Sequence, residues 1–219
     1  MMDNYVSFAD FLNNYTNCSA KKVWHFEKGV IVCGYSAGAL MQHSKIIDGL
    51  KKVEDKLKNF KTVFPMTYGW NAKNTRAMVK AKLHPCQFDS QILEDFLPVN
   101  SLHALRLAAD IFIVIPSTDQ LAASLLEHLA AGSVVITGSW LPYKSLMELG
   151  IYCVTIDSPG DLPNALNDVL DNLDEHKKKS RVNREIILTM MEWCSIKNNW
   201  YKAYQLEEDL QPVEPIHKT

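Results

Sequence analysis

The sequence predicts an α/β fold with a doubly wound, mostly parallel sheet of about six strands. Short apolar runs of strand length recur along the chain, and longer segments with apolar residues at helical spacing separate them. The chain has 219 residues, of which 47% are hydrophobic, so it is long enough to bury one large core. Strands that alternate with helices are typical of a parallel sheet covered by helices on both faces.

The first half of the chain fits this pattern. The β-branched residues of Val30–Cys33 form a strand that stops at Gly34, and a segment with an apolar helical face follows it. The elements expected in order are a helix over Ser7–Tyr15, a strand over Val30–Cys33, a helix over Ala37–Leu57, a strand over Thr62–Pro65 and a helix over Asn71–Leu83.

The second half shows the alternation most clearly. The apolar run Ile111–Pro116 is followed by a polar turn, a helix pattern that Gly132 ends, and another apolar strand. The expected strands are Gln91–Phe96, Ile111–Pro116, Val134–Ile136 and Tyr152–Ile156, and the expected helices are Ser101–Ala109 with a Ser or Asn cap, Leu121–Leu129 and Asp161–Leu173. We therefore expect an N-terminal extension (residues 1–28), a Rossmann-like domain (29–175), and C-terminal helices and a tail (176–219).

The C-terminal segment Glu185–Leu210 is rich in large apolar residues such as Trp193 and Trp200. Helices formed there either pack on the domain or brace a second domain or subunit. The basic run Glu175–Arg181 is interpreted as a solvated helix connection, with contact to a lipid surface as the alternative.

The composition excludes several classes of protein. A formal net charge of −2 argues against a nucleic-acid binder, and no apolar run approaches the length of a transmembrane segment. The N-terminus lacks the pattern of a signal peptide. The cysteines have no CxxC or metal-ligand spacing, which favours free thiols. We therefore expect a cytoplasmic protein that requires no metal and no cofactor, with attachment to the inner face of a membrane as the alternative.

Turns that directly follow strands are the candidate binding site, because doubly wound sheets bind ligands at the carboxyl ends of their strands. These turns are Gly34–Gly38, Met66–Gly69, Ser117–Gln120 and Gly138–Tyr143. Asp119 lies where a helix is expected to begin, and free backbone N–H groups there attract anions and hydroxyl-rich ligands. An acid at this place also stabilises a helix N-terminus without any ligand.

The fourth expected strand and the helix after it resemble the donor-binding half of GT-B glycosyltransferases. In that family a strand ending in Pro-Ser leads to an acid, then to a Glu eight positions on, a small-residue turn with Gly and a Val-rich strand. The matching residues here are Pro116, Ser117, Asp119, Glu127, Gly132 and Val134. The resemblance covers roughly Phe60–Asp171, and more loosely begins at Val30; Asp119 stands where the family usually has Glu.

The resemblance implies a domain that binds a nucleotide-diphosphate sugar, with Asp119 and Glu127 as the catalytic pair. It implies that Glu127 binds the ribose, since a carboxylate accepts two hydroxyl donors at once, and that Asp119 contacts hydroxyls of the transferred sugar. The alternative for Glu127 is a solvent-facing acid. The other expected donor-binding residues are Gly34, Ser36, Gly38, His43, Thr67, Tyr68, Gly69, Leu93, Ser117, Thr118 and Gln120, and the acceptor-side candidates are Trp140 and Tyr143.

The turn Gly34–Gly38 has two interpretations. It matches a Gly-x-Ser-x-Gly nucleophile elbow, which makes Ser36 a candidate nucleophile, or it is a glycine-rich turn that approaches a phosphate. The family usually places an Arg directly after this Gly and a Lys further on, whereas Tyr35 follows the Gly here. Diphosphate binding would then depend on backbone amides or on one of His43, Lys45, Arg76 and Lys144.

The function that the resemblance implies is glycosyl transfer to a hydroxyl acceptor in polysaccharide or glycoconjugate synthesis. The phrase Pro65–Gly69 and the helix Asn74–Val79 also resemble bacterial 4-acetamido-4,6-dideoxygalactose (Fuc4NAc) transferases of envelope polysaccharide synthesis. A GT-B enzyme has two such domains, so the resemblance implies a missing acceptor-binding domain or partner protein. The alternatives are a non-catalytic nucleotide-sugar binding module and a serine hydrolase at Ser36.

Overall fold

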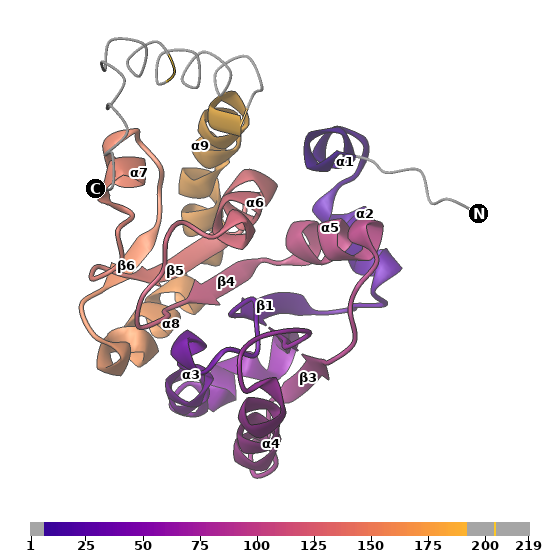
Figure 1. Ribbon diagram of the computed structural model, residues 1–219, viewed down its shortest axis with the longest axis vertical. Coiled ribbons are helices and arrows are strands. Elements are labelled where there is room, and N and C mark those ends of the chain that lie inside the picture. The colour runs from indigo at the N-terminus through magenta and orange to yellow at the C-terminus, as the bar shows by residue number, and fades with distance from the viewer. Residues whose placement is uncertain (1–6, 192–203, 205–219) are drawn as a thin grey trace, which may run out of the picture.

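Six parallel strands form a single sheet in the computed structural model, which describes residues 7–191 and Tyr204 (Figure 1). Their order across the sheet is β3-β2-β1-β4-β5-β6, so the direction of winding reverses between β1 and β4. This is the predicted doubly wound, Rossmann-like α/β fold. The strands are β1 (Gly29–Cys33), β2 (Phe60–Pro65), β3 (Asp89–Leu93), β4 (Ile111–Val114), β5 (Val134–Gly138) and β6 (Val154–Ile156).

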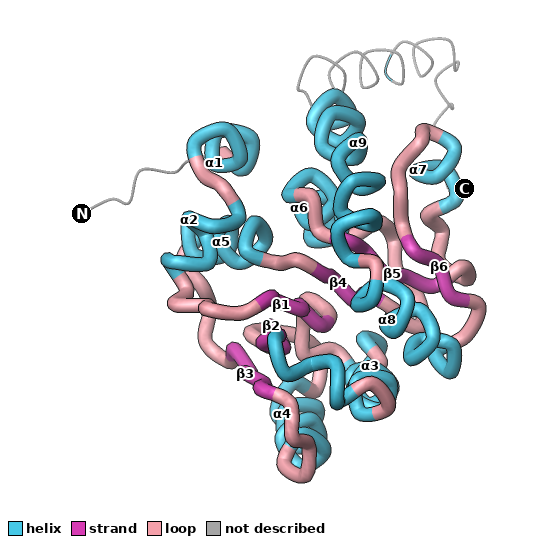
Figure 2. The backbone as a smooth tube through the Cα atoms, turned by 180° about the vertical axis from the view of Figure 1, so that it is seen from behind, coloured by secondary structure: helices cyan, strands magenta, loops and turns pink. Residues whose placement is uncertain are grey.

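Helices cover both faces of the sheet (Figure 2). Successive strand residues alternate between the faces, so Ile31 packs under one helical layer and Val32 under the other. One layer consists of α3 (His43–Lys51), α4 (Ala72–Leu83), α8 (Leu162–Asp171) and the 3-10 helix η2 (Glu54–Asn59). The other consists of α1 (Phe8–Asn14), α2 (Asn17–Val23), α5 (Val99–Ala108), α6 (Ala123–Ala131), α7 (Lys144–Glu148) and α9 (Leu173–Met191). Two further 3-10 helices are η1 (Ala39–Met41) and η3 (Pro159–Asp161).

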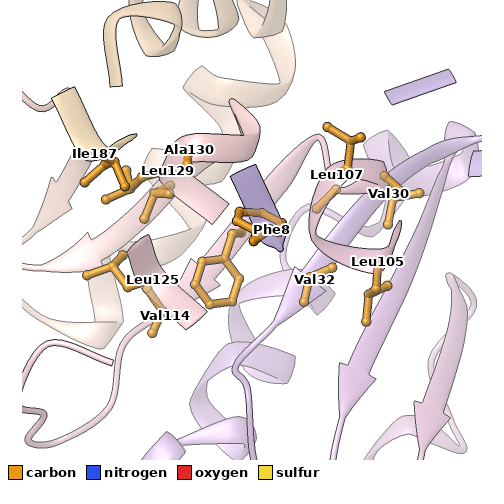
Figure 3. Packing of buried hydrophobic residues seen from close by; sticks show 14 of the residues in the cluster. Phe8, Val30, Val32, Leu105, Leu107, Val114, Leu125, Leu129, Ala130 and Ile187 are labelled. Carbon is orange, nitrogen blue, oxygen red and sulfur yellow. The ribbon is translucent and has the colours of Figure 1, made fainter. Parts of the chain in front are cut away.

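The first and last described helices contribute to the same core. Figure 3 shows Phe8 of α1 and Ile187 of α9 in one cluster with Val114 and Leu125. Phe8 is 9% exposed and Ile187 is fully buried. Of the apolar C-terminal segment, residues 185–191 therefore pack on the domain, while residues 192–203 and 205–210 lie outside the described part of the chain.

Asp110 connects the helices α2 and α9 to the sheet. It directly precedes β4, and its carboxylate is 3% exposed. The carboxylate accepts a hydrogen bond of 2.8 Å from the backbone N–H of Val30 in β1 and pairs with Lys21 of α2 at 2.5 Å. Its other oxygen pairs with Lys177 of α9. One buried acid therefore connects the beginning of the chain, the centre of the sheet and the last described helix.

Several expected elements differ in their bounds from the structure, and two of them differ in more than their bounds. The single helix expected over Ala37–Leu57 is divided into η1, α3 and η2, because Gln42 has a left-handed φ of 55° directly before α3. The helix expected from Ser101 begins at Val99, and Pro98 occupies its N-cap without a side-chain hydrogen bond, so the predicted Ser or Asn cap was wrong. The predicted end of α6 at Gly132 is confirmed, with a left-handed φ of 84°. Within residues 7–191, no helix is long and apolar enough to cross a bilayer.

Candidate functional site

The carboxyl ends of β1 and β4 lie at the point where the strand order reverses. The chain continues to β2 on one side of this point and to β5 on the other, and doubly wound sheets bind ligands at such a reversal point. The predicted loops Gly34–Gly38, Met66–Gly69, Ser117–Gln120 and Gly138–Tyr143 all follow strands at this edge. They form the candidate site.

The turn after β1 rests on a buried histidine. His43 Nε2 lies 2.7 Å from the carbonyl oxygen of Ser36, and the ring is 1% exposed. Gly34 has a φ of 68°, and a Cβ there would lie 2.7 Å from His43 Cε1, so both conformation and space require glycine. Burial lowers the pKa of His43, which keeps the ring neutral and lets Nε2 donate to the carbonyl.

The turns after β1 and β2 are fastened to each other. The backbone N–H of Ala37 donates to the carbonyl of Tyr68 at 2.6 Å. Gly69, with a φ of 140°, packs so closely on Gly38 that a Cβ would lie 2.5 Å from the Gly38 nitrogen. The ring of Tyr68 stays half exposed above these turns. Backbone packing therefore fixes two of the predicted donor-binding loops in one arrangement.

The cations named from the sequence for a diphosphate differ in their availability. The guanidinium of half-buried Arg76 already donates to the carbonyls of Met66, Thr67 and Glu94. Lys144 is 89% exposed and lies 3.7 Å from Glu148 on the same helix. Lys45 is exposed at the start of α3. Of these residues, Lys45 and Lys144 are the ones that a phosphate group can reach without breaking buried hydrogen bonds.

Asp119 lies between two tyrosines at this edge of the sheet. Tyr35, from the turn after β1, donates to Asp119 Oδ1 at 3.1 Å, and Tyr143, from the loop after β5, donates to Oδ2. The backbone N–H of Gln120 also donates to Oδ1, at 2.8 Å. Burial and the adjacent carboxylate raise the pKa of both tyrosines, which keeps their hydroxyls protonated. Three loops of the site thus converge on one carboxylate.

The helix after this loop begins later than the sequence suggests. Its N-cap is Ala122, so Asp119 belongs to the loop that precedes α6. Between them, Leu121 adopts a left-handed φ of 62°, a conformation that is unfavourable for leucine. Such strain persists only where the surroundings enforce it, and it is typical of functional loops.

Glu127 lies on α6 and pairs with a buried arginine of α5. Its Oε2 accepts a hydrogen bond of 3.0 Å from Arg106 Nε, and the Glu127 side chain is 19% exposed. The alternative interpretation of Glu127 was an acid that faces solvent, and the structure does not show that arrangement. Burial lowers the pKa of Arg106, and the negative charge of Glu127 opposes this effect. The pair leaves one partly accessible carboxylate on α6, the helix that follows the loop after β4.

The remaining predicted residues lie at the same edge with different exposure. Leu93 ends β3 and is 8% exposed, whereas Ser117, Thr118 and Gln120 are exposed on the loop after β4. Thr67 is half-buried. The two acceptor-side candidates differ in exposure. Tyr143 is 1% exposed and its hydroxyl contacts Asp119. Trp140 is half-buried and donates from Nε1 to the carbonyl of Pro116 at 2.8 Å.

Ser36 does not have the surroundings of a catalytic nucleophile. Its Oγ accepts a hydrogen bond of 3.3 Å from the backbone N–H of Gly38, and the residue is 6% exposed. The nearby His43 bonds to the carbonyl of Ser36 and not to Oγ. Nucleophilic catalysis requires a base within hydrogen-bond reach of Oγ, and among residues 7–191 no histidine makes that bond.

Comparison with solved structures identifies the fold. The chain is similar to a glycosyltransferase from Rickettsia africae, with a TM-score of 0.72 and 15% identity over 97% of this chain and 57% of that one. It is similar to Anabaena HepE in complex with UDP-glucose, with a TM-score of 0.70 and 11% identity over 94% and 56%. It also matches the C-terminal domain of a glycosyl transferase group 1 family protein (LpcC) from Francisella tularensis, with a TM-score of 0.64 and 14% identity over 86% of this chain and 100% of that domain.

These likenesses establish the predicted fold class, that of the C-terminal domain of GT-B glycosyltransferases. The chain spans about half the length of larger proteins that it matches, such as WaaG (49%) and sucrose-phosphate synthase from Thermosynechococcus elongatus (49%). No protein-family model and no curated protein matches the sequence.

Proposed function

We propose that this chain is the donor-binding domain of a glycosyltransferase, which binds a nucleotide-diphosphate sugar and presents the sugar to a hydroxyl acceptor. The observation that carries the proposal is the placement of Asp119 and Glu127. Both follow β4 at the reversal point of the sheet, where such folds bind ligands, and both are partly accessible. The shared fold with glycosyltransferases, including HepE in complex with UDP-glucose, supports it.

In this proposal each loop of the candidate site binds one part of the donor. Glu127 accepts hydrogen bonds from the ribose, and Asp119, with Thr118 and Gln120, faces the transferred sugar. The turns Gly34–Gly38 and Thr67–Gly69 form the floor for the diphosphate, with Ser36 and His43 shaping the first turn, and the end of β3 at Leu93 lies along the base. Exposed cations such as Lys45 and Lys144 reach the phosphates.

Catalysis then rests on orientation of the donor and on stabilisation of charge on the departing phosphate. A second domain or partner protein supplies the acceptor site, because the chain spans about half the length of the glycosyltransferases that it matches. We place the reaction in polysaccharide or glycoconjugate synthesis, at the cytoplasmic face of a membrane. The Fuc4NAc-transferase resemblance suggests an amino sugar as one donor to test.

A second candidate function is a nucleotide-sugar binding module without transferase activity of its own. The observation that favours it is that both oxygens of Asp119 already accept hydrogen bonds, from Tyr35 and Tyr143, so this carboxylate is held in place by the protein itself. Transfer of a labelled sugar by this chain together with an acceptor-domain partner would decide for the enzyme. Donor binding without transfer in that mixture would decide for the module.

The test of the donor site is thermal unfolding with UDP, GDP, ADP, CDP and their sugars, in wild type and Glu127→Gln. A ligand at a hundred times its dissociation constant adds about 2.7 kcal/mol, which is a shift of roughly 5–10 °C for a domain of this size. Gln is the better substitution than Ala, because Ala would leave Arg106 buried without its partner. A shift that Glu127→Gln reduces by about half, as a tenfold loss of affinity would, supports the proposal, and no shift with any nucleotide refutes it.

A further inference from the structure

Arg106 is a buried cation behind the candidate site. It is 5% exposed, and its guanidinium contacts Glu127 at 3.0 Å and His128 at 3.5 Å. A guanidinium removed from water requires both a compensating charge and hydrogen-bond acceptors. Glu127 supplies the charge, so the position of its carboxylate is linked to the burial of Arg106.

His128 supports the arginine from the other side. The ring is fully buried and stacks on Phe112 with a centroid distance of 3.8 Å. Since a guanidinium can only donate, His128 Nε2 accepts, and Nδ1 therefore carries the proton toward Ser133 Oγ at 3.1 Å. Ser133 in turn donates to the carbonyl of Ala109 at 3.2 Å. Arg106 is thus supported by a hydrogen-bonded chain that ends on the backbone beside β4.

The pair leaves one oxygen of Glu127 available. Oε2 is taken by Arg106, whereas no hydrogen bond to Oε1 is found among residues 7–191. The Glu127 side chain is 19% exposed and that of Arg106 is 6% exposed, so the pair is open only at the carboxylate end. A carboxylate with one oxygen held by an arginine presents its other oxygen to a ligand at a fixed position.

We propose that Arg106 is the positioning residue of the nucleotide site: it holds Glu127 so that the free oxygen meets a ribose hydroxyl. The inference rests on the proposed function, in which Glu127 binds the ribose. It adds that recognition of the ribose depends on a side chain that never touches the nucleotide. Preference for ribose over deoxyribose is then set by the α5–α6 contact.

The test compares Arg106→Met, Arg106→Lys and Glu127→Gln with wild type. Methionine fills a similar volume and removes the buried cation, and Glu127 keeps access to water, so the variant is expected to fold. Lys56→Met is the matched control, because it also replaces a cation by methionine. The ion pair that it removes is exposed and joins η2 to Asp171 of α8, away from Glu127. Circular dichroism and thermal unfolding establish that each variant is folded.

The readout is the ratio of affinities for a ribonucleotide and its deoxy forms. Calorimetry is run with the nucleoside diphosphate that gives the largest thermal shift, and with its 2′-deoxy and 3′-deoxy counterparts. Wild type and Lys56→Met are expected to prefer the ribose form over at least one deoxy form by about tenfold. Glu127→Gln and Arg106→Met should lower that ratio to near one, and Arg106→Lys should restore part of it. The double variant Arg106→Met/Glu127→Gln should lower the ratio no further than either single variant does.

The outcomes separate this inference from the proposed function. A folded Arg106→Met that keeps the wild-type ratio, while Glu127→Gln loses it, overturns the positioning role and leaves the donor site intact. A wild type that binds nucleotide with no preference for ribose also overturns the inference. A wild type that binds no nucleotide overturns the proposed function, and the inference with it.

Discussion

Replacement of Asp110 tests whether one buried acid connects the helices α2 and α9 to the sheet. Asp110→Ala removes the acceptor of the Val30 N–H bond of 2.8 Å and the partner of Lys21 and Lys177. Loss of a charge-assisted hydrogen bond to a buried N–H costs about 2 kcal/mol. The lysines are 20% and 33% exposed and regain water, so each adds only about 0.5 kcal/mol. We expect a total loss of about 3 kcal/mol.

Urea unfolding followed by circular dichroism measures this loss. Asp110→Asn should lose about 1–2 kcal/mol, because the amide oxygen still accepts from Val30 while the charge is gone. Asp171→Ala is the control, since its pair with Lys56 is 58% and 40% exposed and contributes less than about 1 kcal/mol. An Asp110→Ala protein within about 1 kcal/mol of wild type would refute the reasoning. Equal losses for Asp110→Ala and Asp110→Asn would show that the bond to Val30 contributes nothing.

Two further predictions concern glycines and pH. Gly69→Ala should destabilise by about 3 kcal/mol in urea unfolding, because its Cβ would lie 2.5 Å from the Gly38 nitrogen at a φ of 140°. Gly132→Ala, at a φ of 84° with nothing within 4 Å, should lose only about 1 kcal/mol, and equal losses would contradict the packing argument. Burial lowers the pKa of His128 well below its usual value, so the unfolded chain takes up the proton first and stability falls as the pH drops below about 6.5. Between pH 7.5 and 5.5 wild type should lose about 1.4 kcal/mol more than His128→Gln, and parallel losses would argue against a neutral buried ring.

The order of strands and helices could be predicted because local patterns encode it. The central strands β1 and β4 are buried on both faces, so they appear in the sequence as unbroken apolar runs. The edge strand β3 was expected at Gln91–Phe96 but lies at Asp89–Leu93. Its residues are mostly half-buried or exposed, so its apolar pattern is weak. Gly132 was recognisable because a helix that ends in a left-handed residue favours glycine.

The contacts of the site could not be predicted because they join residues far apart in the chain. The sequence showed Glu127 as an acid on an apolar helix, but its partner Arg106 lies on α5, and only the packing of α5 against α6 brings them together. Tyr35 was noted as a departure from the family pattern, with no indication that it bonds to Asp119. Arg106 was the one available signal in the sequence. It lies in an otherwise apolar helix, and a charge that such a helix buries needs a partner of opposite charge.

The two departures from the family pattern are connected in the structure. Asp119 is shorter than the usual Glu, and the residue after Gly34 is Tyr35 in place of a cation, yet the two side chains bond to each other. The hydroxyls of Tyr35 and Tyr143 donate their hydrogen bonds to Asp119, so they can only accept hydrogen bonds from a ligand. An acceptor-only, negatively charged centre suits the hydroxyl donors of a sugar and repels phosphate oxygens. A donor bound as proposed would therefore place its sugar over Asp119 and its diphosphate over the neighbouring turns, toward exposed cations such as Lys45 and Lys144.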